Sequence, residues 1–184
     1  MRAARIALAL PLALLLRAGD AFADPQWNLA LTLGGGARWQ GADRPDGLFA
    51  LGARGDVLFG PRTPYAARVG PWVSARTDDA DDLVLGAGVS AQLPVTVDLP
   101  LVLSAGGVAG VLPDAVRAGV VGRVAWGPRS YNDHGAYVMA GSVWVEGRYF
   151  PRDGGGDVIA GIDLDLRLLT IPVVMLYEFL RGAR

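Results

Sequence analysis

The chain has 184 residues, which fits a single domain of ordinary size. Its formal net charge is −1, every positively charged side chain is an arginine, and no basic tract is present, so a nucleic-acid partner is not expected. Without cysteine the chain has neither disulfides nor thiolate metal ligands, and we expect no cofactor.

The first 23 residues have the pattern of a secretory signal peptide. Arg2 and Arg5 precede the apolar run 6–16, and the segment closes on Ala-Phe-Ala at 21–23. The apolar run is well short of the roughly 20 residues that a membrane-spanning helix needs. We therefore expect export with cleavage after Ala23. No later apolar stretch reaches spanning length, so a mature protein that enters a membrane must cross it with strands.

The rest of the chain alternates apolar segments, rich in Val, Leu, Ala and Gly, with turn-forming clusters, which is typical of an all-β protein. We predict a closed antiparallel eight-stranded β-barrel in meander order, of the transmembrane kind, over residues 24–170. A tail or short helix is expected over 171–184, because Pro172 interrupts strand pairing. The predicted strands cover 27–40, 47–60, 64–77, 83–95, 99–112, 115–127, 135–150 and 157–170.

Within these strands one parity is apolar and the other is polar, as in the last strand, where Ile162 and Leu164 alternate with Asp163 and Asp165. Alternation alone does not say which face is inside. Aromatic side chains on the apolar parity gather near the strand ends, as expected for rings in the two headgroup layers of a membrane. These predicted interface aromatics are Trp27, Trp39, Phe49, Phe59, Tyr65, Trp126, Tyr137 and Tyr149.

The polar parity is rich in arginine, interspersed with small residues that leave room for long side chains. In a closed eight-stranded barrel such side chains meet across a narrow lumen. We expect ion pairs with four carboxylates, because unpaired buried guanidinium groups are costly. The predicted lumen network comprises Arg38, Arg54, Asp56, Arg68, Arg76, Arg117, Arg123, Glu146, Arg148, Asp163, Asp165 and Arg167.

An acidic cluster at Asp78, Asp79, Asp81 and Asp82 falls between two predicted strands. Its oxygens suit Ca²⁺, but the spacing matches no known calcium loop. We interpret the cluster as a solvated loop and predict no metal site.

The signal peptide, the eight alternating strands and the aromatic strand ends resemble the small eight-stranded outer-membrane barrels of bacteria, across residues 24–170. The stretch 126–134, followed by Tyr137 and 145–149, also resembles uncharacterised barrel-like proteins of this size. The resemblance implies a location in the bacterial outer membrane, with outer-membrane lipid and the barrel-insertion machinery as partners. An even strand number then places both termini on the periplasmic side.

Some barrels of this class modify lipid A with a histidine, a serine and an acidic residue. The candidates for such a site here are His134, Asp133, Ser130 and Ser142. No His-x-Ser pair occurs, so we interpret His134 as a loop residue and expect no catalytic site and no enzyme activity.

Four functions fit the sequence. The preferred one is an outer-membrane barrel of structural or adaptor type with a filled polar lumen. The alternatives are a narrow pore for water, ions or small solutes, a lipid A-modifying enzyme, and a soluble secreted barrel that binds an apolar ligand on an inward apolar face.

Overall fold

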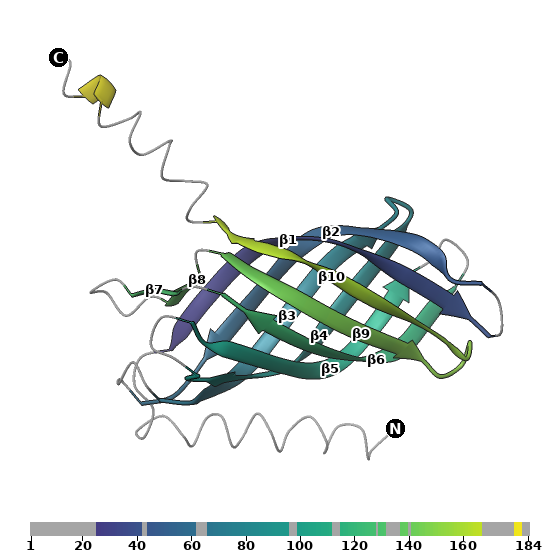
Figure 1. Cartoon of the computed structure of the whole chain (residues 1–184), viewed down its shortest axis with the longest axis horizontal. Helices are drawn as coiled ribbons and strands as arrows, with labels where there is room; N and C mark the ends of the chain where they lie inside the picture. The colour runs from purple at the N-terminus through teal and green to yellow at the C-terminus, as the bar shows by residue number, and fades with distance from the viewer. Residues whose placement is uncertain are drawn as a thin grey trace.

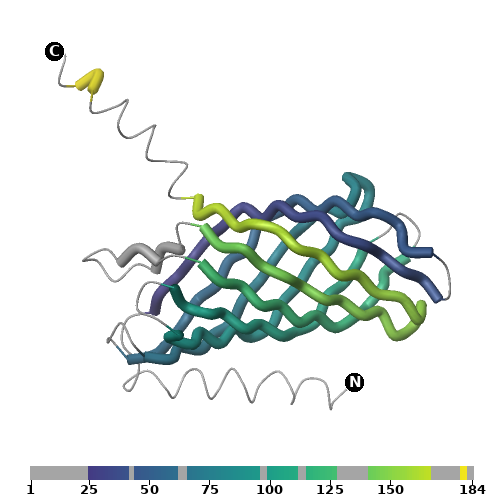
Figure 2. The backbone as a smooth tube through the Cα atoms, in the orientation of Figure 1, coloured from purple at the N-terminus to yellow at the C-terminus, as the bar shows by residue number. Residues whose placement is uncertain are grey.

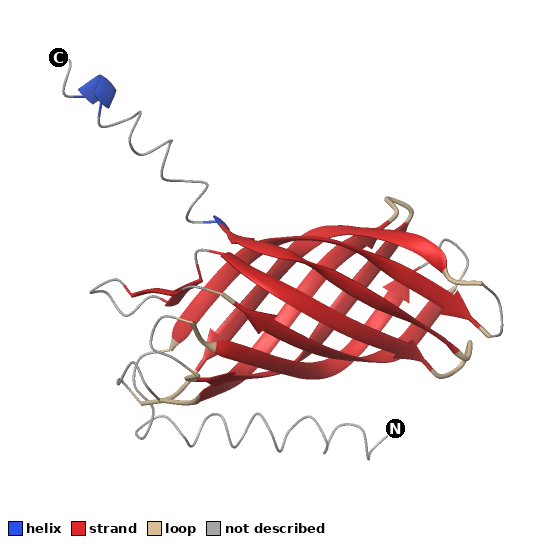
Figure 3. Cartoon of the chain, viewed as in Figure 1, coloured by secondary structure: helices blue, strands red, loops and turns tan. Residues whose placement is uncertain are grey.

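The computed structural model describes residues 25–41, 44–61, 66–95, 99–111, 115–127, 129–131, 137–139, 141–166 and 179–181. Across these ranges, eight long strands close into one antiparallel barrel (Figure 1). Loops and helical residues form a small part of the described chain (Figure 3). The barrel strands are β1 (Gln26–Gln40), β2 (Asp46–Leu58), β3 (Arg68–Asp78), β4 (Asp82–Leu93), β5 (Leu101–Val111), β6 (Val116–Trp126), β9 (Gly141–Phe150) and β10 (Gly155–Asp165).

Each barrel strand pairs with its neighbours in sequence, and β1 also pairs with β10 to close the ring, which confirms the predicted meander. The closing ladder runs from Ala30↔Asp165 to Gln40↔Gly155. The path of the backbone shows that β1 begins and β10 ends at one end of the barrel, which we call the terminal end (Figure 2). The opposite end, where β1, β3, β5 and β9 finish, is the turn end.

The first six predicted strands agree closely with β1 to β6, whereas the seventh, predicted over 135–150, was wrong in its first part. Here β7 (Arg129–Tyr131) and β8 (Tyr137–Met139) pair with each other in a separate two-stranded sheet, and β9 begins only at Gly141. The ladder between β6 and β9 reaches no further than Trp126↔Val143. Between the end of this ladder and β9, the backbone N–H and C=O groups of β7 and β8 are satisfied by pairing with each other. This local pairing closes a shorter loop than an extension of the barrel wall would, so it costs less loop-closure entropy.

The last predicted strand also ends early. β10 stops at Asp165 and Leu166 is helical, while 167–170 lie outside the described residues. A short helical segment at 179–181 is present in the predicted C-terminal tail. In the part of the chain that the structure describes, no helix is long and apolar enough to span a membrane.

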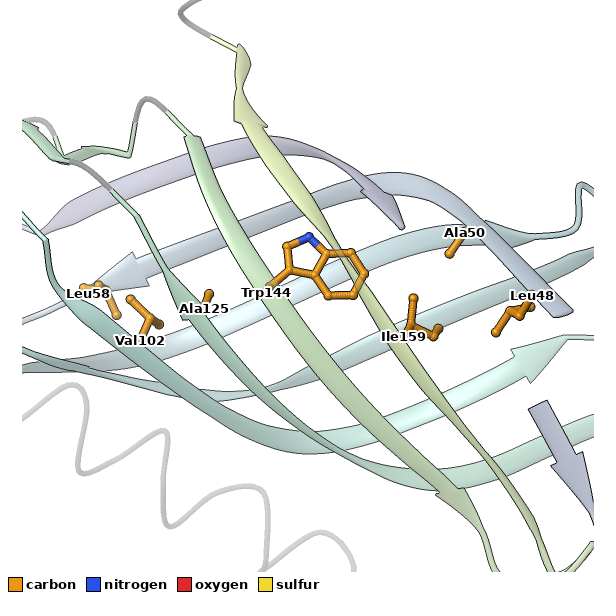
Figure 4. Close-up of a cluster of buried hydrophobic side chains, with 7 residues drawn as sticks. All are labelled: Leu48, Ala50, Leu58, Val102, Ala125, Trp144 and Ile159. Carbon is orange, nitrogen blue, oxygen red and sulfur yellow. The ribbon is translucent and has the colours of Figure 1, made fainter. Parts of the chain in front are cut away.

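In each barrel strand the apolar side chains, which occupy every second position, face outward. Leu29, Leu31 and Leu33 are exposed on the outer face of β1, while Thr32 between them is only 3% exposed inside the barrel. A minority of inward side chains are also apolar and pack together among the polar ones. One such cluster, drawn in Figure 4, contains Leu48, Ala50, Leu58, Val102, Ala125, Trp144 and Ile159.

The turn between β3 and β4 contains two non-glycine residues in the left-handed region, Asp79 (φ 53°) and Ala80 (φ 66°). The Asp79 carboxylate accepts a hydrogen bond from the backbone N–H of Phe49 at 2.8 Å. Ala80 has no side chain that could compensate its backbone strain by hydrogen bonding.

We expect Ala80→Gly to raise the free energy of unfolding by about 0.5–1 kcal/mol, because glycine relieves the left-handed strain of about 1–2 kcal/mol but adds unfolded-state entropy. Ala87→Gly, on the outer face of β4, is the matched control and should lower it by about 0.5–1 kcal/mol. Urea unfolding of both variants measures the difference. Equal destabilisation by the two glycines would contradict the assignment of strain to Ala80.

Candidate functional site

The most buried arginine of the lumen is Arg148 on β9, whose side chain is fully enclosed. Its guanidinium lies 2.7 Å from a carboxylate oxygen of Asp78, 3.0 Å from Asp157 and 3.8 Å from Glu146. These carboxylates come from β3, β10 and β9, so one arginine ties together three strands across the barrel. Such a buried cation is tolerated because it is surrounded by opposite charge.

Arg38 and Arg76 extend this cluster toward the turn end and across to the opposite wall. The Arg38 guanidinium lies 3.2–3.3 Å from carboxylate oxygens of Asp78, Asp82 and Asp157. Arg76 donates a hydrogen bond of 2.6 Å to Glu146 and lies 3.4 Å from Asp78. Asp78 therefore contacts three arginines, and its negative charge is shared among them.

Arg117 closes the network at the turn end. Its guanidinium lies 3.7 Å from Asp82 and 3.8 Å from Asp153, and it stacks over the Phe150 ring at 4.9 Å from the centroid. The side chains of Arg117 and Asp153 are each about one-fifth exposed. Together with Arg38, whose side chain is 26% exposed, this pair forms the more solvent-accessible part of the lumen network.

Nearer the terminal end, Arg54 on β2 binds Asp56 through two hydrogen bonds of 2.8 and 2.9 Å. The same guanidinium donates to the hydroxyls of Ser90 and Ser104, each at 2.9 Å. Ser90 in turn donates to Asp56 at 2.7 Å. Small hydroxyl side chains on β4 and β5 thus leave space for the arginine stem and satisfy its head.

Arg123 on β6 forms the corresponding pair on the opposite side, with Asp163 of β10. Ser142 donates a hydrogen bond of 3.2 Å to the same carboxylate oxygen of Asp163. Arg123 also lies 3.9 Å from Glu146, which links this pair to the Arg148 cluster.

Two tryptophans fill the lumen between these charges. The guanidinium of Arg54 lies 4.4 Å from the ring centroid of Trp72, and that of Arg123 lies 4.3 Å from Trp144, both within cation–π range. The rings occupy space opened by inward glycines, since a Cβ at Gly34 would come within 2.6 Å of the Trp144 ring. Both indoles are at least 97% buried, at 3% and 2% exposure.

At the terminal end, Arg68 donates hydrogen bonds to the Gln26 side chain and to the Pro61 carbonyl, the latter at 3.2 Å. Asp165 is also buried there, and it carries further interactions. Arg167, predicted to join the network, lies outside the described residues. Two cavities in this filled interior, one beside Arg54 and one beside Arg38, each have a volume of about 20 Å³, which is enough for a single water molecule.

The structure thus brings together eleven of the twelve predicted lumen residues, but the predicted set of carboxylates was incomplete. Asp78 and Asp82 were interpreted as solvated loop residues, and this was wrong: they are 1% and 8% exposed and point into the lumen. The turn between them is only three residues long, so Asp78↔Asp82 is still a strand pair of inward parity. Asp79 and Asp81 are exposed as predicted. Asp157 also belongs to the network, where it pairs with Arg38 and Arg148. The prediction omitted it, although its position on the polar parity of the last strand already indicated an inward side chain.

With these additions the inward charges balance among the described residues. Seven arginines meet seven carboxylates, and the additional carboxylate of Asp153 lies at the rim. The inward arginines are Arg38, Arg54, Arg68, Arg76, Arg117, Arg123 and Arg148, and the carboxylates are Asp56, Asp78, Asp82, Glu146, Asp157, Asp163 and Asp165.

The predicted interface aromatics fall into three groups. Trp27, Phe49, Trp126 and Tyr149 are about half exposed on the outer face, while Trp39 and Phe59 are half-buried. Tyr65 and the side chain of Tyr137 lie outside the described part, and the backbone of Tyr137 belongs to β8 rather than to the barrel wall. Trp72, Trp144 and Phe150 are inward rings that the prediction missed, although their polar-parity positions were the available signal.

Of the weak catalytic candidates, Ser142 is a buried hydrogen-bonding partner of Asp163. His134, Asp133 and the side chain of Ser130 lie outside the described residues. Across the described ranges, no group of three or more His, Cys, Asp or Glu side chains could hold a metal ion.

These features define a closed eight-stranded barrel whose outer wall is apolar and whose lumen is filled by ion pairs and indole rings. No protein-family model and no curated protein matches the sequence. Among solved structures, one from the de novo design of transmembrane β-barrels has a TM-score of 0.42 and 14% identity, covering 75% of this chain and 94% of that one. The solution NMR structure of the de novo designed TMB2.3 has a TM-score of 0.38 and 16% identity, covering 77% and 94%.

We expect Glu146→Gln to lower the free energy of unfolding by about 3–5 kcal/mol, because it removes the buried carboxylate that lies 2.6 Å from Arg76 and also faces Arg123 and Arg148, and leaves only Asp78, at 3.4 Å, as a charged partner of Arg76. Asp153→Asn is the matched control at the wetter rim and should cost about 1 kcal/mol or less. Equilibrium urea unfolding of the two variants tests the ranking. A Glu146→Gln barrel as stable as the parent would show that the central ion pairs are not needed.

Proposed function

We propose that this chain is a bacterial outer-membrane β-barrel that spans the membrane with its eight strands and acts as a structural, non-conducting scaffold. The observation that carries the proposal is the inverted distribution of side chains, with an apolar outer face around a polar, charge-balanced lumen. In water such a face would be costly to expose, whereas in a bilayer it meets hydrocarbon.

The dimensions of the wall fit a bilayer. The shortest barrel strand, β9, has ten residues and is therefore about 33 Å long, which at a tilt of about 40° spans roughly 25 Å of membrane. That is the height of the apolar band in outer-membrane barrels, about 25 Å. Between the ends the outer face carries mainly Leu, Val, Ala and Gly, as at Leu31, Val73, Leu85, Val124 and Val145.

Outward aromatic rings at both ends of the barrel support the proposal that each end lies at a membrane interface. Trp27 and Trp126 lie at the terminal end of their strands, and Phe49 and Tyr149 lie toward the turn end. Rings of this kind favour the headgroup layers because they are apolar over most of their surface and polar or polarisable at one edge. The two groups would therefore hold the barrel at a set depth.

The filled lumen is evidence for a scaffold role rather than a pore. Trp72, Trp144 and the ion pairs of Arg148 occupy the interior, and the two cavities beside Arg54 and Arg38 are water-sized. A narrow pore for water, ions or small solutes would need these groups to move apart. A soluble barrel for an apolar ligand would need the apolar parity inside, and a lipid A-modifying enzyme would need a reactive group facing lipid.

In this proposal the predicted signal peptide over 1–23 directs export, and barrel-insertion machinery delivers the chain to the outer membrane, with lipid as its surrounding partner. The terminal end then faces the periplasm, so the β7–β8 hairpin lies on the periplasmic side and the short turns lie outside. The hairpin is the feature best placed for an adaptor role, because its two strands form a separate sheet at the terminal end of the barrel and do not pair with the barrel strands (Figure 1).

We expect Val145→Arg, at mid-height on the outer face of β9, to cost about 2–4 kcal/mol of folding free energy in a bilayer. Val116→Arg, at the turn end of β6, is the matched control and should cost about 1 kcal/mol or less. Refolding into phosphatidylcholine vesicles, followed by urea titration and gel mobility with and without boiling, measures both. Extraction of the parent as a water-soluble monomer without a heat shift would reject the membrane proposal.

The full chain reconstituted in a planar bilayer should show no conductance steps above background, because the lumen is filled. The double variant Trp72→Ala/Trp144→Ala serves as the positive control, and its two removed indoles should open stepwise conductance. Conductance steps of comparable size in the parent would contradict the scaffold proposal and favour the narrow pore instead.

A further inference from the structure

The outer wall of the barrel is hollowed at the terminal end, where β6, β9 and β10 lie side by side. The hollow has a volume of about 360 Å³, against about 20 Å³ for each of the two lumen cavities. Small-molecule sites in proteins occupy roughly 300–1,000 Å³, so this space is large enough to hold part of a ligand. We call it the outer groove, and the apolar side chains that line it are Leu99, Trp126, Val143, Ile162 and Leu164.

A missing side chain on β9 opens the outer groove. Gly141 is the first residue of β9 and has the outward parity of Val143. It pairs with Leu164 of β10, whereas the β6–β9 ladder ends at the next outward pair, Trp126↔Val143. A Cβ on Gly141 would lie 4.0 Å from Cδ2 of Leu164. A larger side chain at this position would therefore project beside Leu164 and fill the groove.

The chemistry of the lining selects an apolar occupant. The lining side chains of β6, β9 and β10 that face outward are 42–56% exposed, and all are aliphatic or aromatic. Ser142 and Asp163 also border the groove, but their side chains are buried in the lumen, where Ser142 and Arg123 donate to Asp163. Among the described lining residues none presents a charged group to the groove, so a hydrocarbon chain fits it and a polar ligand or metal ion does not.

The position of the outer groove on the barrel selects the kind of hydrocarbon. The groove is continuous with the apolar wall, and Trp126 lies at the terminal end, where the rings of outer-membrane barrels meet the headgroup layer. In the proposed orientation this end faces the periplasm, so the molecules beside it are phospholipids. A lipid chain in the groove contacts protein at its floor and its sides, and therefore gains more close contacts than a chain on the flat wall.

We propose that the outer groove binds one acyl chain of a phospholipid from the periplasmic leaflet, with Gly141 as its floor and with Trp126 and Leu164 at its sides. This inference rests on the proposed function, because only a barrel that spans the membrane meets such a chain. The bound lipid would fix the periplasmic edge of the wall where the β6–β9 ladder has ended.

Titration of acyl-brominated phosphatidylcholine into the barrel, folded in nonionic detergent micelles, tests the site. Bromine quenches tryptophan emission on contact, so we expect a quenching phase in the parent that saturates at a low ratio of lipid to detergent. Trp126→Phe should remove this phase. Trp27→Phe is the matched control and should keep it, because Trp27 lies at the same end and is equally exposed, at 50% against 49%, but does not line the groove.

Filling the groove provides the second comparison. Gly141→Leu should shift the quenching phase to a several-fold higher ratio of lipid to detergent. Gly147→Leu should leave it unchanged, because Gly147 is an outward glycine of the same strand that does not line the groove and has open space around its Cβ position. The tryptophan comparison needs no change at Gly141, so it decides the question even if Gly141→Leu does not fold.

The gel mobility of the parent with and without boiling separates the two proposals. A parent that shifts on heating but lacks the low-ratio phase would overturn the lipid site and leave the membrane barrel standing. A parent without a heat shift would reject the membrane barrel itself. Stronger displacement of the brominated probe by lipopolysaccharide than by unlabelled phosphatidylcholine would assign the groove to the other leaflet and would also overturn the inference.

Discussion

The architecture depends on the burial of charge inside a closed ring of strands. An eight-stranded barrel has a lumen too narrow for bulk water, so every inward guanidinium must find its partners among the other inward side chains. Arg148 meets this demand by contacting carboxylates of three strands, and Asp78 meets it by contacting three arginines. These contacts cross the barrel, so they hold its walls at one spacing in addition to the backbone ladder.

Aromatic rings fill the lumen space that the ion pairs leave unoccupied. Trp72 and Trp144 lie beneath the guanidiniums of Arg54 and Arg123, and inward glycines such as Gly34 and Gly86 provide the space for the rings. Large rings, small residues and long cations thus interlock, as packing at ordinary protein density requires. The result is a solid interior, and this solidity favours a scaffold over a conduit as the proposed role.

Strand parity is the level at which sequence reasoning was most successful. Alternation along each strand separated outward Leu29, Leu31 and Leu33 from inward Thr32, and the same period placed most of the lumen arginines. It failed where local and long-range pairing compete, as at 137–139, which form a hairpin with β7 instead of joining the barrel wall. It also failed at Asp78 and Asp82, because turn length decides whether an acidic residue ends a strand or enters a loop.

By itself the sequence determined an all-β chain of eight alternating strands with arginine on one face, because side-chain direction in a strand follows from period two alone. Only the tertiary structure decided which carboxylate meets which arginine. Arg38 and Asp78 are distant in sequence, as are Arg76 and Glu146, and their contacts follow from the stagger of strands around the closed ring. The inward tryptophans and the water-sized cavities followed from the same closure, because each depends on what the opposite wall leaves unfilled.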